Sequence, residues 1–189
     1  MNPSDKRFYI LNLLENYEAS DAMEERSKKE IVEFVKKHPD CFDNNLKAGH
    51  VTASSLVVDK DFESTLLTLH TKLDRWLQFG GHSDNDPNAL AVALRETAEE
   101  SCLESLHFLP RYNGIFDLDV HPIPENSKMP THNHYDIRIL LVANKNEEYT
   151  VTHESKNLKW VKLDEVSKYN AQPAFLRLVE KAKKIKRSS

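Results

Sequence analysis

Three glutamates with the spacing of a metal site lie close together in the middle of the chain. Glu96, Glu99 and Glu100 are related as i, i+3 and i+4, so on a helix their carboxylates project from one face. Like charges at this spacing destabilise a bare helix by roughly 0.2–0.5 kcal/mol per pair, and a hard divalent cation reverses that effect. Arg95 precedes Glu99 by one turn and can hold a carboxylate by a charge-assisted hydrogen bond. The stretch is a candidate cation site, and a solvated acidic surface is the alternative.

The segment around these glutamates resembles the Nudix box, Gly-x5-Glu-x7-Arg-Glu-U-x-Glu-Glu-x-Gly-U, in which U is a bulky aliphatic residue. Counted from Gly81, five positions are in register with the pattern, namely Arg95, Glu96, Glu99, Glu100 and Leu103. Three others depart from it: Pro87 replaces the first Glu, Thr97 an aliphatic residue and Cys102 the second Gly. Pro87 fits the first turn of a helix that Asp86 caps. Cys102 is expected at a helix end with a left-handed backbone, where a side chain costs on the order of 1 kcal/mol.

The resemblance extends beyond the box and covers most of the chain. Four further stretches look like one bacterial subgroup of Nudix hydrolases, namely Gly49–Ser54, Trp76–Gln78, Asp119–Pro124 and His132–Asp136. This likeness implies an α/β fold, a Nudix α/β/α sandwich with a mixed sheet and an N-terminal helical extension. We expect the extension to cover residues 1–45 and the Nudix domain to cover residues 46–189.

The resemblance also implies roles for individual residues. Glu96, Glu99, Glu100 and the backbone carbonyl of Gly80 would bind Mg²⁺ or Mn²⁺, because glycine lets the main chain approach an ion closely. Either Glu99 or Glu154, which lies on a loop before a predicted strand, would act as the general base. Arg95 would orient the glutamates. Since the usual first Glu of the box is replaced, Arg95 must find its partner in Glu96, Glu99 or elsewhere.

Several histidines are candidates for substrate binding. His132, His134 and Asp136 alternate, so in an extended segment they share one face. Imidazoles and a carboxylate on one face can bind a transition metal or grip a phosphate, and structural hydrogen bonding is the alternative. No other histidine completes a recognisable four-ligand zinc spacing. His82 follows the glycine pair, where it either flanks the substrate or caps the loop.

Length and charge restrict the class of protein. The 189 residues suit one domain with a sizeable core, and the net charge of -4 argues against nucleic-acid binding through general electrostatics. The basic tail Lys181–Arg187 is typical of a solvated helix end. No apolar run is long enough to span a bilayer, and the N-terminus lacks the apolar core of a signal peptide. We therefore expect a cytoplasmic protein with Cys41 and Cys102 reduced, and with neither nucleic-acid nor membrane partners.

Hydrophobic periodicity predicts the elements that position these residues. Two helices are expected between Ser4 and His38, the second capped by Ser20 or Asp21, and they would pack on the protein's own core, form a homodimer contact or cover the substrate. Predicted strands cover residues 51–59, 62–70, 76–79, 106–109, 114–120, 134–143 and 159–163. The box helix is predicted from Pro87 to Ser101, with Leu90, Ala91, Leu94 and Ala98 on its buried face. Prolines predict an irregular loop over 121–131, and helices are expected over 164–169 and 173–186.

Taken with the resemblance, these features predict a metal-dependent hydrolase of a phosphoanhydride. The expected substrate is a small molecule, a nucleoside diphosphate linked to another moiety or a similar organic pyrophosphate. A nucleotide sensor that keeps the fold without turnover is the alternative from a different class. Isopentenyl diphosphate isomerase, a Nudix relative, is disfavoured because it uses a cysteine near the loop at Gly80, where this sequence has none.

Overall fold

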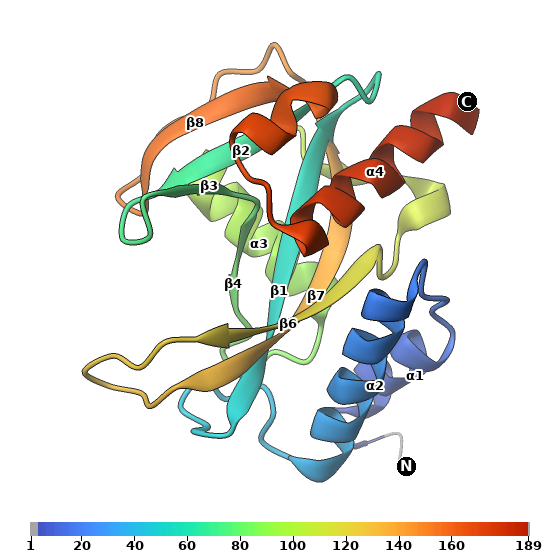
Figure 1. Ribbon diagram of the computed structural model, residues 1–189, viewed down its shortest axis with the longest axis vertical. Helices are drawn as coiled ribbons and strands as arrows, with labels where there is room; N and C mark the ends of the chain where they lie inside the picture. The colour runs from blue at the N-terminus through green and yellow to red at the C-terminus, as the bar shows by residue number, and fades with distance from the viewer. Residues whose placement is uncertain (1–3, 189) are drawn as a thin grey trace. The chain divides into compact units, whose positions relative to one another are not determined.

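The computed structural model describes residues 4–188 (Figure 1). The contacts between residues divide the chain into two compact units. The first unit contains the residues up to Ala53 together with Gly81–Val92 and Gly114–Ile139. The second contains Ser54–Gly80, Ala93–Asn113 and the chain from Leu140 onward. The two long strands β1 and β7 begin in the first unit and end in the second.

Each predicted strand overlaps an observed one, but the strand predicted over 76–79 is divided into two, Arg75–Leu77 and Phe79–His82, and the last strand begins at Ser155 instead of at residue 159. The observed strands are β1 (Gly49–Asp59), β2 (Ser64–His70), β3 (Arg75–Leu77), β4 (Phe79–His82), β5 (His107–Phe108), β6 (Asp117–Ile123), β7 (His132–Ala143) and β8 (Ser155–Lys162). Hydrogen bonds join them in the order β3-β2-β1-β7-β5, and β4 pairs with β1, β6 with β7 and β8 with β2. Within the second unit, β2 pairs antiparallel with β1, β3 and β8, so it lies at the centre of that part of the sheet.

The first unit contains the N-terminal helices α1 (Phe8–Glu15) and α2 (Ala22–Lys37), and α2 packs against β6 (Figure 1). Asp21 caps α2, since its side chain accepts a hydrogen bond from the Glu24 backbone N–H at 2.8 Å. The ring of Phe34 stacks on Tyr135 of β7, with ring centroids 3.8 Å apart. His38 has an extended backbone and ends α2 before Pro39, as predicted.

A buried carboxylate ties α2 to the strand beside it. The Glu24 side chain is fully buried and accepts hydrogen bonds from the Ser20 backbone N–H at 2.6 Å and the Ser20 hydroxyl at 2.7 Å. It also accepts hydrogen bonds from the Tyr17 hydroxyl and from the Leu118 backbone N–H of β6. Since each of these donors serves the charged form, the carboxylate is buried without being left unsatisfied.

Helix α3 (Ala89–Ser101) carries the box glutamates, and it differs from the prediction at both its start and its buried face. The helix begins two residues later than predicted because Asn88 caps it, its side chain accepting from the Ala91 N–H at 3.2 Å, while Asp86 accepts from Asn88. None of the four residues predicted for the buried face is fully buried: Ala91 is exposed, and Leu90, Leu94 and Ala98 are half-buried. The buried side chains are instead Ala89, Val92, Ala93, Thr97, Glu100 and Ser101.

A hydrogen bond explains this rotation of the buried face. The Thr97 hydroxyl lies 2.6 Å from the Ser55 hydroxyl of β1 and also donates to the Ala93 carbonyl, so a polar residue can lie on the face that packs inward. Thr97 stands where the box usually has an aliphatic residue, and the hydroxyl pair takes the place of apolar packing. Glu100, one turn further on, is buried as a consequence. Cys102 ends the helix with φ 57°, the predicted left-handed conformation.

The remaining helices lie in the second unit. The 3-10 helix η2 (Leu163–Lys168) and the helix α4 (Pro173–Ser188) lie where the two C-terminal helices were predicted. Phe175, Leu178 and Val179 of α4 are buried. In the first unit, β6 continues through Pro122, which the prediction had placed in a loop. Proline is tolerated there because β6 pairs with β7 through one edge and can lack an N–H on the other. Among residues 4–188, no helix combines the length and the apolar character that crossing a bilayer requires.

Candidate active site

The three box glutamates differ sharply in exposure. The Glu99 side chain is 61% exposed and that of Glu96 14%, while Glu100 as a whole residue is 8% exposed. Arg95 lies beside the first two: its Nη1 is 2.8 Å from Glu96 Oε1 and 3.4 Å from Glu99 Oε2. Arg95 thus finds its partners within the box, although the usual first Glu is absent. This arrangement orients two carboxylates and leaves the third without a cation.

The surroundings of Glu100 disfavour the charged form of its carboxyl group. Burial, together with the negative charges of Glu154, Glu96 and Glu99, raises the pKa of Glu100 from its ordinary value of 4.5 to about 8. The backbone N–H of Gly80 opposes this effect by hydrogen-bonding the carboxylate. The second oxygen, Oε2, is buried and has no hydrogen-bond partner among the described residues. Such an orphaned acceptor is costly in a folded protein unless a proton or a cation satisfies it.

The structure brings Glu154 and Gly80 to this carboxylate. Glu154 lies in the turn before β8, as predicted, and its charge acts directly on Glu100 although half of its own side chain is exposed. Gly80 lies in β4 with φ 148°, a backbone conformation that L side chains rarely adopt. A larger residue would therefore be strained at the point where the main chain donates to Glu100.

The donor set fits a hard divalent cation. The charges of Glu96, Glu99 and Glu154 act on the buried Glu100, whose Oε2 lacks a partner among the described residues, and carboxylate oxygens are the ligands that Mg²⁺ and Mn²⁺ prefer. A bound cation would satisfy Oε2 and would offset the burial and the like charges that raise the pKa of Glu100. The metal-binding role of these glutamates stays a prediction.

The predicted histidines lie in the first unit. His82 is the last residue of β4 and is exposed. His132 and His134 lie at the start of β7, which pairs with β6, and His134 is the pairing partner of His121. The Nδ1 of His132 is 2.7 Å from the Pro130 carbonyl, so that nitrogen carries the proton. His50 of β1 adjoins them, with ring centroids 4.6 Å from His134 and 5.0 Å from His82.

Sequence reasoning did not single out His50 as a site residue. The available signal was weak: Gly49 and His50 directly precede the strand predicted over 51–59, and this position alone does not show which other strand His50 faces. Only the pairing of β1 with β7 brings His50 to the alternating residues His132 and His134.

Asp136 belongs to a buried ion cluster with Arg138. The guanidinium of Arg138 is 3.0 Å from Asp136, 2.8 Å from Asp119 and 3.5 Å from Asp117, and all four side chains are buried. Asp136 also accepts a hydrogen bond from the Thr52 hydroxyl at 3.1 Å. The three carboxylates raise the pKa of Arg138 against the opposing effect of burial. These contacts give Asp136 a structural role beside the substrate-binding role predicted for it.

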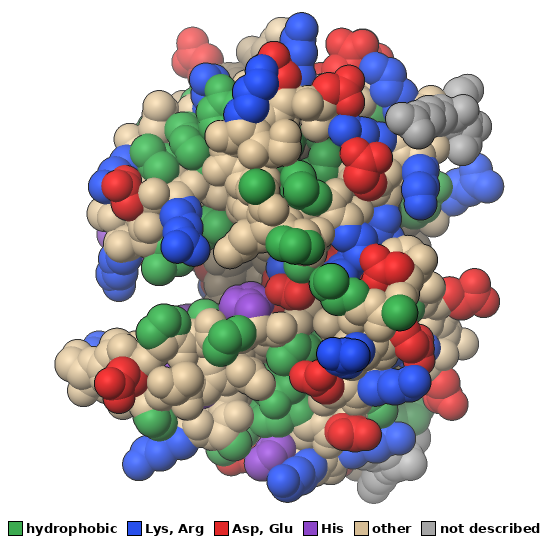
Figure 2. All heavy atoms as spheres, viewed as in Figure 1, with side chains coloured by type: hydrophobic (Ala, Val, Ile, Leu, Met, Phe, Trp, Pro, Cys, Tyr) green, Lys and Arg blue, Asp and Glu red, His purple; other side chains and the backbone are tan. Residues whose placement is uncertain are grey.

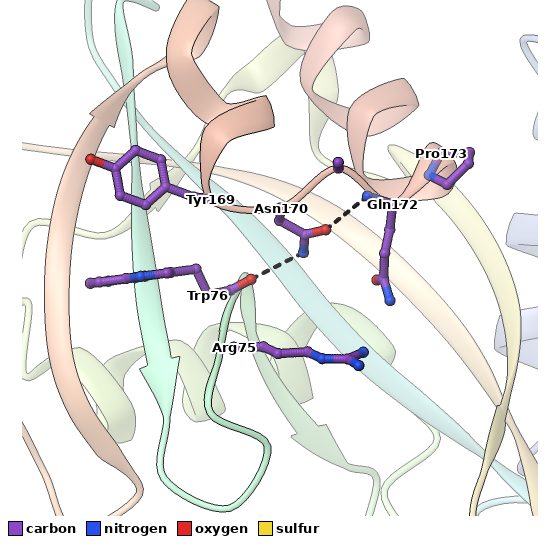
Figure 3. Close-up of a pocket in the computed structure, with 7 residues that line it drawn as sticks. Arg75, Trp76, Tyr169, Asn170, Gln172 and Pro173 are labelled. Atoms are coloured by element: carbon purple, nitrogen blue, oxygen red, sulfur yellow. Dashed lines mark hydrogen bonds between the residues drawn. The ribbon is translucent and has the colours of Figure 1, made fainter.

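The second unit also contains an open pocket of about 470 Å³ (Figure 3). Arg75, Trp76 and Tyr169 line one part of it, and Asn170 bridges the Trp76 carbonyl and the Gln172 backbone N–H at 3.0 Å each. Trp76 packs edge-on against Tyr169, with centroids 5.7 Å apart. None of the lining residues is a predicted site residue. Trp76 is half-buried, whereas Phe79, three residues further on, is fully buried.

Figure 2 shows acidic and basic side chains intermixed over the face in view.

Comparisons with solved structures identify the fold. An Ap4A hydrolase from C. elegans superposes with a TM-score of 0.59 at 19% identity, covering 74% of this chain and 98% of that one. A Nudix-family hydrolase from Clostridium perfringens gives 0.52 at 23% identity, with 72% and 97% covered. The E. coli dihydroneopterin triphosphate pyrophosphohydrolase gives 0.53 at 15% identity, with 69% and 92% covered. No family profile and no curated protein sequence matches the chain. The α/β class predicted from the box is confirmed: the chain has the α/β/α fold of the Nudix hydrolases, with a mixed sheet and the N-terminal helices α1 and α2.

Proposed function

We propose that this protein is a divalent-metal-dependent pyrophosphohydrolase. Its substrate would be a nucleoside diphosphate linked to another moiety or a similar organic pyrophosphate. The observation that carries the proposal is Glu100, a buried carboxylate with an unpartnered oxygen among three further glutamates. A purely structural acidic surface would not bury its central carboxylate against like charges.

Each side chain has a distinct part in the proposed reaction. Glu96, Glu99, Glu100 and the carbonyl of Gly80 would hold Mg²⁺ or Mn²⁺, which would neutralise diphosphate oxygens and lower the pKa of a bound water. Arg95 keeps Glu96 and Glu99 in place through the contacts described above. A carboxylate then accepts the proton of the water as its oxygen attacks phosphorus and the anhydride P–O bond breaks.

Two carboxylates can serve as that base. Glu154 is half-exposed, next to the Glu100 charge, and lies on a turn that can adjust to a substrate. Glu99 is more exposed but is engaged by Arg95. Gln variants at the two positions separate the roles: loss of the base should lower kcat by roughly 10²–10⁴-fold, and the other variant should mainly weaken metal binding.

The structural neighbours support the reaction class. One is named for Ap4A hydrolysis and another is named as a pyrophosphohydrolase of dihydroneopterin triphosphate. A small-molecule substrate, a cytoplasmic location, the division at residue 45 and the assignment to one bacterial subgroup are further parts of this proposal. The substrate-binding roles of His82, His132, His134 and Asp136 stay predictions, as does a homodimer.

The proposal is tested by product release from a panel of nucleoside triphosphates, sugar nucleotides, dinucleoside polyphosphates, ADP-ribose, NADH and coenzyme A. Each assay is run with Mg²⁺, with Mn²⁺ and with chelator. Hydrolysis should require the metal and should fall by at least about 10²-fold in Glu100→Gln. Glu104→Gln is the matched control, because Glu104 is an exposed glutamate just beyond α3. Tight nucleotide binding with no product under any condition would instead support the sensor.

A further inference from the structure

The first unit gathers three histidines from three different strands. Single ring nitrogens of His50 (β1), His82 (β4) and His134 (β7) all lie within 4.8 Å of one another. His50 is buried, His134 is half-buried and His82 is exposed, so the group reaches from the interior to the surface. Tetrahedral coordination at about 2.0–2.1 Å separates ligand nitrogens by about 3.3 Å. Small rotations of the side chains would therefore bring these nitrogens to the distances that a metal requires.

His50 points to a ligand independently of the spacing. It is 1% exposed, and neither of its ring nitrogens has a hydrogen-bond partner of standard geometry among the described residues. The Leu46 backbone lies near enough to favour a proton on the ring, which leaves the other nitrogen with an unused lone pair. A buried imidazole whose lone pair is unsatisfied is costly, and a metal ion is the partner that neutral imidazole binds best.

The backbone holds His50 in this position. Gly49 has φ 117°, and a Cβ at that residue would lie 2.4 Å from the Asn133 carbonyl oxygen. Because no side chain fits there, β1 can approach β7 closely and place His50 against His134. The position of His50 therefore depends on the glycine that precedes it in β1.

The surroundings of His50 and His134 favour the neutral form of the imidazole, which is the form that coordinates a metal. Burial lowers the pKa of His134 to about 2, helped by the positive charges that His50, His82, His121 and His132 would carry. Burial likewise lowers the pKa of His50 to about 4, with His82 and His132 adding to the effect. At neutral pH these two rings can bind a cation without first losing a proton.

We propose that His50, His82 and His134 form a second metal site, selective for a borderline transition-metal ion such as Zn²⁺, with a fourth position left for water or another ligand. Three imidazoles are a poor site for Mg²⁺, which prefers oxygen ligands, and a good one for Zn²⁺. The site is thus chemically distinct from the glutamates of α3. His132 and His121 lie beside His134, with ring centroids 5.4 Å and 5.7 Å from it, and one ring nitrogen of each is engaged, by the Pro130 carbonyl and by Asp119 respectively.

The test uses Co²⁺ as the probe, since its visible absorption reports coordination by nitrogen, followed by displacement with Zn²⁺. The wild-type protein, freed of metal by chelator and dialysis, is titrated alongside His82→Ala and His134→Gln. His153→Ala is the control for a surface imidazole, because its side chain is 91% exposed. Glu100→Gln is the control for binding at the glutamates.

Wild type, His153→Ala and Glu100→Gln should bind one equivalent with the spectrum of four-coordinate Co²⁺. His82→Ala and His134→Gln should each weaken binding by about tenfold or more. His82 is exposed, so its variant keeps the fold, and circular dichroism checks this for both variants. Equal affinity in His82→Ala and wild type, loss of the signal in Glu100→Gln alone, or absence of binding would each overturn the proposal.

Discussion

Glu100→Gln should stabilise the metal-free protein, and the gain should grow with pH. Burial and three like charges raise the pKa of the Glu100 carboxyl from 4.5 to about 8. The folded state therefore keeps a proton that the unfolded state releases. A raised folded-state pKa contributes stability that is fully present below pH 4.5 and is lost as pH rises to 8. Glutamine cannot ionise and is free of this loss.

The size of the effect follows from the two pKa values. Between pH 5 and pH 8 the wild type should lose about 3.5 kcal/mol of unfolding free energy relative to the variant, at 1.36 kcal/mol per pH unit. For a chain of this size that difference corresponds to roughly 7–14 °C in Tm. Any constant effect of the amide, such as a weaker bond to the Gly80 N–H, cancels when the two pH values are compared.

The assay is urea unfolding of wild type, Glu100→Gln and the control Glu104→Gln at pH 5 and pH 8 in chelator. A repeat with excess Mg²⁺ should restore much of the wild-type stability at pH 8 and leave Glu100→Gln unchanged. A difference between wild type and Glu100→Gln that does not vary with pH would show that Glu100 is ionised without metal, and the electrostatic reasoning would fail.

Three further changes probe the structure around the site. Arg138→Met leaves three buried aspartates without their cation, so urea unfolding should show a loss of about 3–5 kcal/mol, and a near-neutral result would contradict the described ion cluster. Burial raises the pKa of the Cys41 thiol to about 12, whereas Cys102 is exposed. A thiol reagent at pH 8 should therefore modify Cys102 alone in the native protein. Mass spectrometry of the labelled peptides checks this, and labelling of Cys41 in the native protein would refute it. Glu24→Ala leaves the buried hydroxyl and amide donors around it unpaired and should cost about 2–4 kcal/mol in thermal unfolding, and an unchanged Tm would refute the role given to this carboxylate.

The contacts of Arg95 with the box glutamates were predictable because they are local. Glu96, Glu99 and Arg95 are neighbours on one helix, and helical geometry alone places them together. The left-handed conformation of Cys102 was likewise predictable from its place at a helix end. The depth at which Glu100 is buried was not, because it depends on which face of α3 meets β1.

Contacts between distant residues account for what the sequence did not reveal. The Thr97 hydroxyl meets Ser55 across 42 positions and turns a polar face of α3 inward, against the apolar periodicity. His50 meets His134 because β1 lies beside β7 in the sheet, and no pattern within either strand specifies that neighbour. The carboxylate of Asp136 accepts a hydrogen bond from Arg138, a contact that the alternation of His132, His134 and Asp136 did not indicate.

The most direct test of the account is hydrolysis of the phosphoanhydride panel by wild type and Glu100→Gln, with Mg²⁺, with Mn²⁺ and with chelator. We predict that at least one compound releases phosphate, pyrophosphate or monophosphate products only with metal, and that Glu100→Gln loses this activity while Glu104→Gln keeps it. Metal-independent turnover, or near wild-type turnover by Glu100→Gln, would contradict the assignment of the α3 glutamates as the catalytic centre.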